Sequence, residues 1–179
     1  MKALIFDLRG NPGGLLPNAV TIGRMFVKKG PIVQIVDKKG EKEYLNATGD
    51  IEVPMDLPMV LLVDEGSASA SEIVSGAIKD NNRATLIGTK TFGKGLVQTV
   101  HELDDGSGMA ITTNKYLTTK GTDINKKGID PNIVVEIPKN IQVESPDSSG
   151  IDKNDTQLKK AISFLKDNLA KKDQGKKEG

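Results

Sequence analysis

Short apolar runs alternate with helical apolar periodicity along the N-terminal half of the chain. Residues 3–6, 58–63 and 84–88 are largely apolar, a pattern typical of strands buried on both faces of a parallel sheet. Residues 15–27 and 69–79 instead place apolar side chains three or four positions apart, which is the period of an amphipathic helix. Because strands and helices follow one another in this order, the pattern predicts an α/β layered core.

The pattern changes in the second half of the chain. A strand is predicted on each side of the polar turn at 104–108, because both flanks combine apolar and β-branched residues. Residues 139–152 have the composition of a linker, and residues 153–170 carry an apolar stripe at helical spacing. The charged residues 171–179 are expected to form a disordered tail, which leaves a core domain over residues 1–138.

Composition narrows the chemistry that the chain can perform. It has 179 residues, of which 36% are hydrophobic and 27% charged, values typical of one globular domain. The net charge of +1 gives no reason to expect nucleic acid as a partner. The chain has no cysteine and one histidine, His101, which excludes a thiol nucleophile, a disulfide framework and a Cys- or His-rich metal site. We therefore expect no metal and no cofactor, and we expect His101 to be an ordinary strand or surface residue.

Three serines crowd the turn between the predicted strand at 58–63 and the predicted helix at 69–79, namely Ser67, Ser69 and Ser71. Because this turn follows the carboxyl end of a buried strand, it lies where α/β folds commonly place their sites. The helix N-terminus also offers unpaired N–H groups and a positive dipole end, which would hold an oxyanion. Helix capping is the alternative, since serine is a preferred cap, and the segment taken alone favours it.

A glycine-rich turn occupies residues 10–14, directly after the first predicted strand. Its glycines would let backbone N–H groups approach a ligand and form an anion-binding nest. A tight strand-to-helix turn explains the same residues and is favoured for this segment alone. Asp7 and Arg9, just before the turn, are expected to form a structural ion pair.

Lys94 lies between Gly93 and Gly95 and beside apolar residues. In surroundings that disfavour its charge, a lysine becomes a neutral amine that can act as a general base. The alternative is an ordinary exposed loop lysine. Residues 88–95 also nearly match a phosphate-binding loop, but Gly95 stands where that loop needs the Ser or Thr that holds Mg²⁺, so nucleotide binding is not expected.

These segments together resemble the C-terminal processing peptidases, also called tail-specific proteases. The matching motifs are Asp-Leu-Arg-Gly-Asn-Pro-Gly-Gly at 7–14, Gly-Ser-Ala-Ser-Ala-Ser-Glu-Ile at 66–73, Thr-Phe-Gly-Lys-Gly-Leu-Val-Gln at 91–98 and Gly-Ile-Asp-Pro at 128–131. They cover roughly residues 3–137 in the order of the family. The resemblance implies a ClpP/crotonase-like α/β core with a mixed sheet and flanking helices, so residues 1–138 would be its peptidase catalytic core.

The resemblance also implies an activity and a set of site residues. The activity is that of a serine endopeptidase that cleaves proteins near their C-termini through an acyl-enzyme, and its substrates are proteins or peptides with apolar C-termini. The matching motifs imply that Ser69 is the nucleophile, that Lys94 is the general base and that Gln98 supports the lysine. Such a Ser/Lys dyad needs no histidine. The backbone N–H groups implied for the oxyanion hole are those of Ala70 and of either Gly13 or Gly14.

Members of this family commonly carry an N-terminal region and a PDZ domain, and they work outside the cytoplasm. Both regions are expected in the full-length protein, because this chain opens directly into the strand at 3–6. The expectation is therefore a truncated core that self-associates through its exposed first strand. Two alternatives stay open: a catalytically inactive core that only binds peptides or oligomerises, and a crotonase relative acting on acyl-CoA, which the presence of both Ser69 and Lys94 disfavours.

Overall fold

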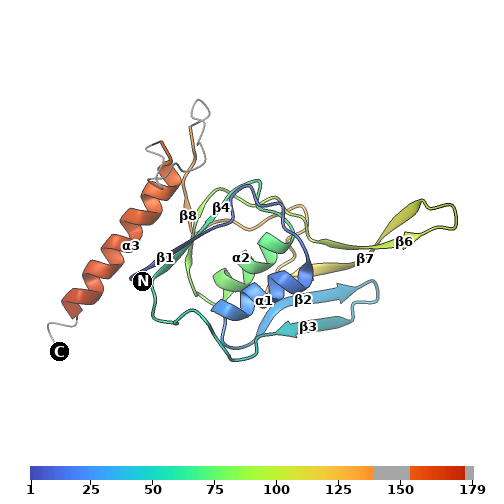
Figure 1. Cartoon of the computed structure of the whole chain (residues 1–179), viewed down its shortest axis with the longest axis horizontal. Coiled ribbons are helices and arrows are strands. Elements are labelled where there is room, and N and C mark those ends of the chain that lie inside the picture. Colours follow the sequence, from blue (N-terminus) through green and yellow to red (C-terminus); the bar gives the residue numbers. More distant parts are fainter. Residues whose placement is uncertain (139–153, 176–179) are drawn as a thin grey trace.

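The computed structural model describes residues 1–138 and 154–175, which form two four-stranded sheets and three helices (Figure 1). The first, sheet A, is parallel throughout and has the strand order β1-β4-β5-β8. Parallel neighbours need a crossover connection such as a helix, so the predicted α/β layered core is confirmed. The strands of sheet A are β1 (Leu4–Asp7), β4 (Met59–Val63), β5 (Thr85–Gly88) and β8 (Ile133–Val134).

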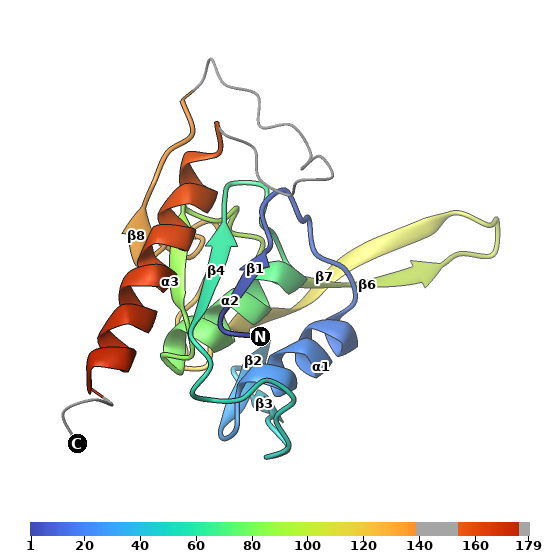
Figure 2. The ribbon, with the colours of Figure 1, turned by 60° about the vertical axis from the view of Figure 1, so that its left-hand side comes forward.

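The second, sheet B, is antiparallel and has the strand order β3-β2-β7-β6. Its last two strands form a long ribbon that projects from the body of the molecule (Figures 1 and 2). His101 lies on this ribbon and is exposed, as the sequence predicted. The strands of sheet B are β2 (Pro31–Asp37), β3 (Lys42–Asn46), β6 (Leu96–Glu102) and β7 (Gly108–Leu117).

Helices α1 (Leu16–Phe26) and α2 (Ala70–Asp80) share one apolar core with strands of both sheets. Helix α2 is buried at every position from Ala70 to Ile78. A helix that is buried all round needs small residues to fit, and α2 has them, including Gly76, where an added Cβ would come within 3.1 Å of the Thr118 side chain. This tight packing fixes the N-terminus of α2, which follows the serine turn.

Strand β4 is fully buried because it is covered on both faces. Successive side chains of a strand point to opposite faces, so Leu61 and Val63 enter the core around α1 and α2. Val60 and Leu62 pack instead against helix α3 (Thr156–Gly175), which covers the other face of sheet A (Figure 2). Full burial of each of these aliphatic side chains stabilises the fold by about 1.5–3 kcal/mol. The two-sided cover explains the uninterrupted apolar run in the sequence.

Helix α3 differs in its bounds from the helix predicted over 153–170. It runs from Thr156 to Gly175, so residues 171–175, which were expected to belong to the disordered tail, are helical. Lys172 in this last stretch donates from Nζ to the carbonyl oxygen of Asp56 at 2.7 Å, which ties the end of the helix to the body. The predicted linker lies outside the described residues. Within the two described ranges, no helix combines the length and the apolar character needed to cross a bilayer.

Candidate active site

Ser69 occupies a strained backbone conformation at the turn between β4 and α2. Its φ of 54° and ψ of −115° lie in a region that residues with a side chain rarely adopt. Holding such a residue there costs about 1–3 kcal/mol and is common at functional sites. A sharp strand-to-helix turn of this kind presents a serine hydroxyl above the end of a sheet. The half-buried Ser69 therefore has the backbone geometry of a presented nucleophile.

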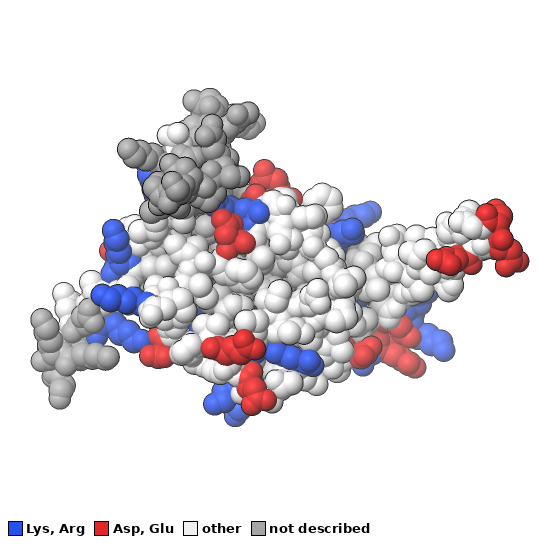
Figure 3. Space-filling view, viewed as in Figure 1, with Lys and Arg blue, Asp and Glu red and all other residues white. Residues whose placement is uncertain are grey.

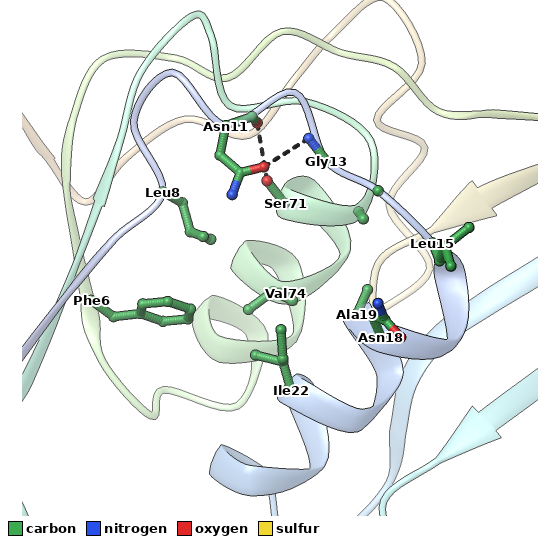
Figure 4. Close-up of a pocket in the computed structure, with 12 residues that line it drawn as sticks. Phe6, Leu8, Asn11, Gly13, Leu15, Asn18, Ala19, Ile22, Ser71 and Val74 are labelled. Atoms are coloured by element: carbon green, nitrogen blue, oxygen red, sulfur yellow. Dashed lines mark hydrogen bonds between the residues drawn. The ribbon is translucent and has the colours of Figure 1, made fainter.

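The neighbouring serines have structural roles. The Ser67 hydroxyl donates to the Leu8 carbonyl oxygen at 2.8 Å, and the Ser71 hydroxyl donates to the Asn11 carbonyl oxygen at 3.1 Å (Figure 4). Both serines are buried. Their bonds fasten the glycine-rich turn at 10–14 to the start of α2, so the turn and the helix form one unit.

The glycine-rich turn runs directly beside the N-terminus of α2. Gly13 has a φ of 100°, and a Cβ added there would lie 2.6 Å from the Ala68 carbonyl oxygen and 2.8 Å from the Ala70 nitrogen. The Gly13 N–H group donates to Asn11 Oδ1 at 2.9 Å (Figure 4). Within the described parts of the chain, the N–H groups of Gly14 and Ala70 make no hydrogen bond. Two unpaired backbone donors therefore lie on either side of the close contact at Gly13.

The two glycines beside Lys94 are required by a close backbone approach. Gly93 has a φ of 91°, and a Cβ added there would lie 2.9 Å from the Gly128 nitrogen. A Cβ added at Gly95 would lie 2.7 Å from the Asn125 nitrogen. The Lys94 side chain itself is exposed, so the described residues of this chain do not supply the surroundings that the sequence led us to expect for a neutral lysine.

A buried carboxylate, Glu72, joins the serine turn to the lysine turn. Its Oε2 accepts the backbone N–H groups of Ser69 at 3.0 Å and of Lys94 at 2.8 Å. Its Oε1 accepts the Gly93 N–H group at 2.7 Å and the Thr91 hydroxyl at 2.6 Å. A carboxylate has about four acceptor sites, and these four donors fill them. The position in the first turn of α2 also suits a negative charge.

Glu72 is a residue whose role is not predicted from the sequence motifs. The signal that could have found it is the spacing to Ser69, since an acid three residues after a serine at a helix start is the pattern of a capping box. In this structure the Glu72 side chain does bond back to the Ser69 N–H group, but it also holds a second segment of the chain. The capping-box spacing, a local sequence pattern, thus coincides with a contact between segments that are distant in the sequence.

Ser69 and Lys94, the two residues of the predicted dyad, are linked through their backbones. Ser69 and Lys94 donate to the same Glu72 oxygen, but no hydrogen bond joins the Ser69 hydroxyl to the Lys94 amine among the described residues. Gln98 lies on β6, is exposed, and makes no hydrogen bond to Lys94 in that same part of the structure. Lysine has many rotamers and is costly to immobilise, so an exposed lysine needs additional contacts to be held in place.

A cavity of about 200 Å³ opens beside the two unpaired N–H groups. It lies between β1, α1 and α2 (Figure 4). Both Gly14 and Ala70 line it. Apolar cavities of about 150 Å³ in proteins bind a molecule as large as benzene, so this one has room for an apolar side chain. None of the described residues that line it is charged, although Asn11, Asn18 and Ser71 are polar. Its apolar lining residues are Phe6, Leu8, Leu15, Ala19, Ile22, Ala70 and Val74.

Asp7 and Arg9 form the ion pair that the sequence predicted. Arg9 Nη2 lies 2.7 Å from Asp7 Oδ2, and Arg9 also contacts Asp155, the residue before α3. Burial alone would lower the pKa of Arg9, but its hydrogen bonds to Asp7 and Asp155 hold that pKa above its ordinary value. The pair lies directly before the glycine-rich turn.

Charged groups of both signs are scattered over the face of the molecule shown in Figure 3.

Comparison with known proteins gives a consistent result. Residues 1–135 match the sequence model of Peptidase family S41. The chain is 52% identical over 134 residues to the carboxyl-terminal-processing protease of Synechocystis sp., a match that covers 75% of this chain and 31% of that protein. It is 45% identical over 136 residues to the chloroplastic C-terminal processing peptidase of Tetradesmus obliquus, covering 76% of this chain and 29% of that protein.

Solved structures agree with these sequence matches. The photosystem II D1 C-terminal processing protease superposes with a TM-score of 0.72 at 44% identity, covering 76% of this chain and 35% of that chain. A peptidase of Parabacteroides merdae, at 23% identity and a TM-score of 0.70, shares the fold over 92% of this chain. The chain spans about a third of the length of the sequence relatives and of the D1 processing protease.

Proposed function

The chain belongs to Peptidase family S41, and from that premise we propose that it carries the Ser69/Lys94 catalytic dyad of a C-terminal processing serine protease. The observation that carries the proposal is the buried Glu72 carboxylate, because it holds the backbones of both residues at once. A second support is the strained combination of φ 54° and ψ −115° at Ser69, a backbone conformation that is costly for a residue with a side chain and common at functional sites.

The proposed reaction begins when the neutral Lys94 amine takes the Ser69 hydroxyl proton while Oγ attacks the peptide carbonyl carbon. The carbonyl π electrons move to the oxygen, and the resulting oxyanion is held by backbone N–H groups. Collapse of this intermediate breaks the C–N bond, and the Lys94 ammonium returns its proton to the leaving amine. Water then hydrolyses the acyl-enzyme with Lys94 again as the base.

We assign the oxyanion hole to the N–H groups of Ala70 and Gly14. Donors to a developing oxyanion must be unpaired before the reaction, and the Gly13 N–H group is already bonded to Asn11 Oδ1 at 2.9 Å. Gly13 instead serves as the point of close contact that brings Gly14 beside the start of α2. Of the two glycines that the family resemblance leaves open, the hydrogen bonding thus favours Gly14.

We further propose that bound substrate organises Lys94. The residues around Lys94 leave apolar side chains in water, since Phe92 is 65% exposed and Leu96 is 38% exposed. A peptide laid over these side chains would exclude water from the amine and favour its neutral form. Hydrogen bonds between catalytic groups are often formed only in the substrate complex. On this view Gln98 joins Lys94 when substrate binds.

The cavity beside Gly14 and Ala70 would receive the side chain that precedes the scissile bond. Because its lining has no charged group, a charged substrate side chain would enter without a partner, which is strongly unfavourable. We therefore propose apolar residues before the cleaved bond, within protein substrates that end in apolar C-termini. Hydrophobic contacts of this kind discriminate between similar side chains by about 10–200-fold.

A catalytically inactive core that binds peptides or oligomerises is the second candidate. The observation that favours it is the exposed Lys94 without a hydrogen bond to the Ser69 hydroxyl within the described residues. Strand β1 lies at the edge of sheet A and could pair with another copy. This candidate predicts peptide binding without turnover.

Covalent labelling separates the two candidates. The chain, and any longer form of the protein, would be treated with an alkyl fluorophosphonate, and the adduct located by mass spectrometry. The dyad predicts an adduct on Ser69, with a rate that falls in Lys94→Ala and is retained in the control Ser75→Ala, whose hydroxyl bonds only to the Ser71 carbonyl oxygen among the described contacts. Peptide binding by a folded protein whose Ser69 stays unlabelled would favour the inactive core.

A further inference from the structure

Arg9 connects the glycine-rich turn to the C-terminal helix. Its Nε and Nη2 donate to Asp7 at 3.0 and 2.7 Å, while its Nη1 donates to Asp155 Oδ1 at 3.0 Å. Its Nη2 also lies 2.8 Å from Asp155 Oδ2, and Nη1 donates to Gln157 Oε1 at 3.1 Å. A planar guanidinium with five donors can serve two carboxylates in this way. The contact spans 146 positions of sequence.

Asp155 is the most buried carboxylate among the ion pairs of the described residues. Its side chain is 2% exposed, whereas the side chains of Asp130 and Asp56, in other ion pairs, are 70% and 83% exposed. Burial would raise the pKa of Asp155, but the bonds from Arg9 and from the Leu158 N–H group hold that pKa below its ordinary value. A carboxylate this deep is stable only while its partners stay in place.

Asp155 also fixes where α3 begins. Its Oδ1 accepts the Leu158 N–H group at 2.8 Å, which is the bond of a helix N-cap. Beside it, Gln157 is 2% exposed and donates from Nε2 to the Val135 carbonyl oxygen at 2.8 Å. The start of α3 is therefore held rigidly against sheet A, and Arg9 is bonded to a fixed point.

The residue after Arg9 begins the turn that carries the proposed oxyanion donor. Gly10 donates its N–H to Asp64 Oδ1 at 2.8 Å, and the turn then passes Asn11 and Gly13 to reach Gly14. We propose that Asp155 is a positioning residue: through Arg9, it holds the 10–14 turn so that the Gly14 N–H group faces the reacting carbonyl oxygen. This proposal rests on the proposed function of Ser69 and the Ala70/Gly14 donors. It makes helix α3 part of the catalytic apparatus although it touches no substrate.

The central variant is Asp155→Asn, because asparagine caps a helix as well as aspartate does but cannot give Arg9 a charged partner. The matched control is Asp56→Asn, which breaks the exposed ion pair with Lys172 at the other end of the same helix. Gln157→Ala removes the neutral acceptor of Arg9 together with the bond to the Val135 carbonyl oxygen, and it is a second variant that leaves the Asp155 cap and charge in place. Asp155→Glu keeps the negative charge and should therefore retain part of the activity that Asp155→Asn loses.

Two readouts are needed, each at matched folded fraction. The first is amide hydrogen exchange in the 10–14 turn, which reports how firmly the turn is held and needs no activity. The second is the rate of Ser69 labelling, or kcat and KM on an apolar peptide. We expect exchange in the turn to rise and acylation and kcat to fall by about tenfold in Asp155→Asn, as for loss of a charge-assisted hydrogen bond, with KM nearly unchanged.

The expected order of effect is Asp155→Asn, then Gln157→Ala, with Asp56→Asn indistinguishable from the unaltered chain. Equal exchange and equal acylation in Asp155→Asn and Asp56→Asn would overturn the proposal. If the unaltered protein shows no labelling of Ser69, the proposed function fails. The exchange measurement then still decides whether Asp155 holds the turn.

Discussion

The turn that carries Ser69 and the turn that carries Lys94 meet at one carboxylate, Glu72, yet the segments that follow these two residues differ greatly in burial. On the Ser69 side, helix α2 is buried from Ala70 to Ile78, and the flanking serine hydroxyls bond to backbone carbonyl oxygens. On the Lys94 side, the lysine and most of β6 are exposed. We infer that the core of this chain fixes Ser69, the proposed nucleophile, whereas Lys94, the proposed base, would take its working position from the substrate that covers it.

The largest expected effect on activity is at Ser69, in the buried turn. Replacing Ser69 with alanine removes the attacking atom, so turnover should fall by at least about a thousandfold. The control Ser75→Ala keeps the nucleophile and loses only the bond from its buried hydroxyl to the Ser71 carbonyl oxygen, so it should turn over substrate while losing about 1 kcal/mol of stability. Steady-state rates and urea unfolding measure both quantities. Turnover retained in Ser69→Ala would remove this residue from the mechanism.

At the exposed side, the change Lys94→Arg should separate activity from stability. Arginine keeps the positive charge but does not lose its proton, so general-base catalysis and about 10²–10⁴-fold of the rate should disappear. Because Lys94 is exposed, the free energy of unfolding should change by no more than about 0.5 kcal/mol. The measurement is kcat beside a urea midpoint for Lys94→Arg and Lys94→Ala. A Lys94→Arg enzyme with most of its rate would limit the lysine to an electrostatic role.

A change at Glu72, which joins the two turns, should alter both stability and activity. In Glu72→Gln an NH₂ group replaces one carboxylate oxygen and faces N–H donors, which leaves buried donors unpaired. We expect a loss of about 1–3 kcal/mol in stability, together with a lower kcat because the Ser69 and Lys94 backbones are no longer held together.

The matched control for this change is Glu65→Gln on the same turn. Glu65 is exposed and accepts only the Thr89 hydroxyl among the described contacts, so its replacement should stay within about 0.5 kcal/mol. Equal unfolding midpoints for Glu72→Gln and Glu65→Gln would show that the carboxylate does not join the two sides.

The smallest expected effect is on the selectivity for the substrate side chain before the scissile bond. Ile22 is half-buried and lines the apolar cavity, so Ile22→Phe should partly fill it and disfavour large side chains before the scissile bond. We expect the ratio of kcat/KM values for leucine and alanine peptides to fall by about tenfold. Thr21→Ala, at the neighbouring exposed position, should leave that ratio unchanged. A ratio that does not respond to Ile22→Phe would place the substrate side chain elsewhere.

The elements of the core could be predicted because each one buries side chains at a fixed period. The apolar run at 58–63 predicted β4, and the spacing over 69–79 predicted α2, which the structure places at Ala70–Asp80. These patterns are local, and the burial that they reflect is nearly complete. The family motifs then located the Ser69 and Lys94 turns, although their chemistry remains a proposal.

What the sequence could not predict depends on contacts between distant segments. Glu72 bonds to Thr91, Gly93 and Lys94, and no local pattern records those partners. The exposure of Lys94 follows from how β6 leaves the body of the molecule, since apolar neighbours in sequence do not ensure burial in space. The preference for Gly14 over Gly13 likewise rests on one side-chain bond, from Gly13 N–H to Asn11.

The unusual backbone conformation of Ser69 affects which residue is retained at position 69. Glycine adopts a φ of 54° with ψ of −115° at little cost, so Ser69→Gly would relieve strain worth about 1–3 kcal/mol. A population of variants selected for heat resistance alone would therefore drift towards glycine at position 69 and lose the hydroxyl. Stability and the proposed activity therefore favour different residues at position 69. The proposed role of Ser69 as a nucleophile is therefore what would retain a strained serine where glycine is more stable.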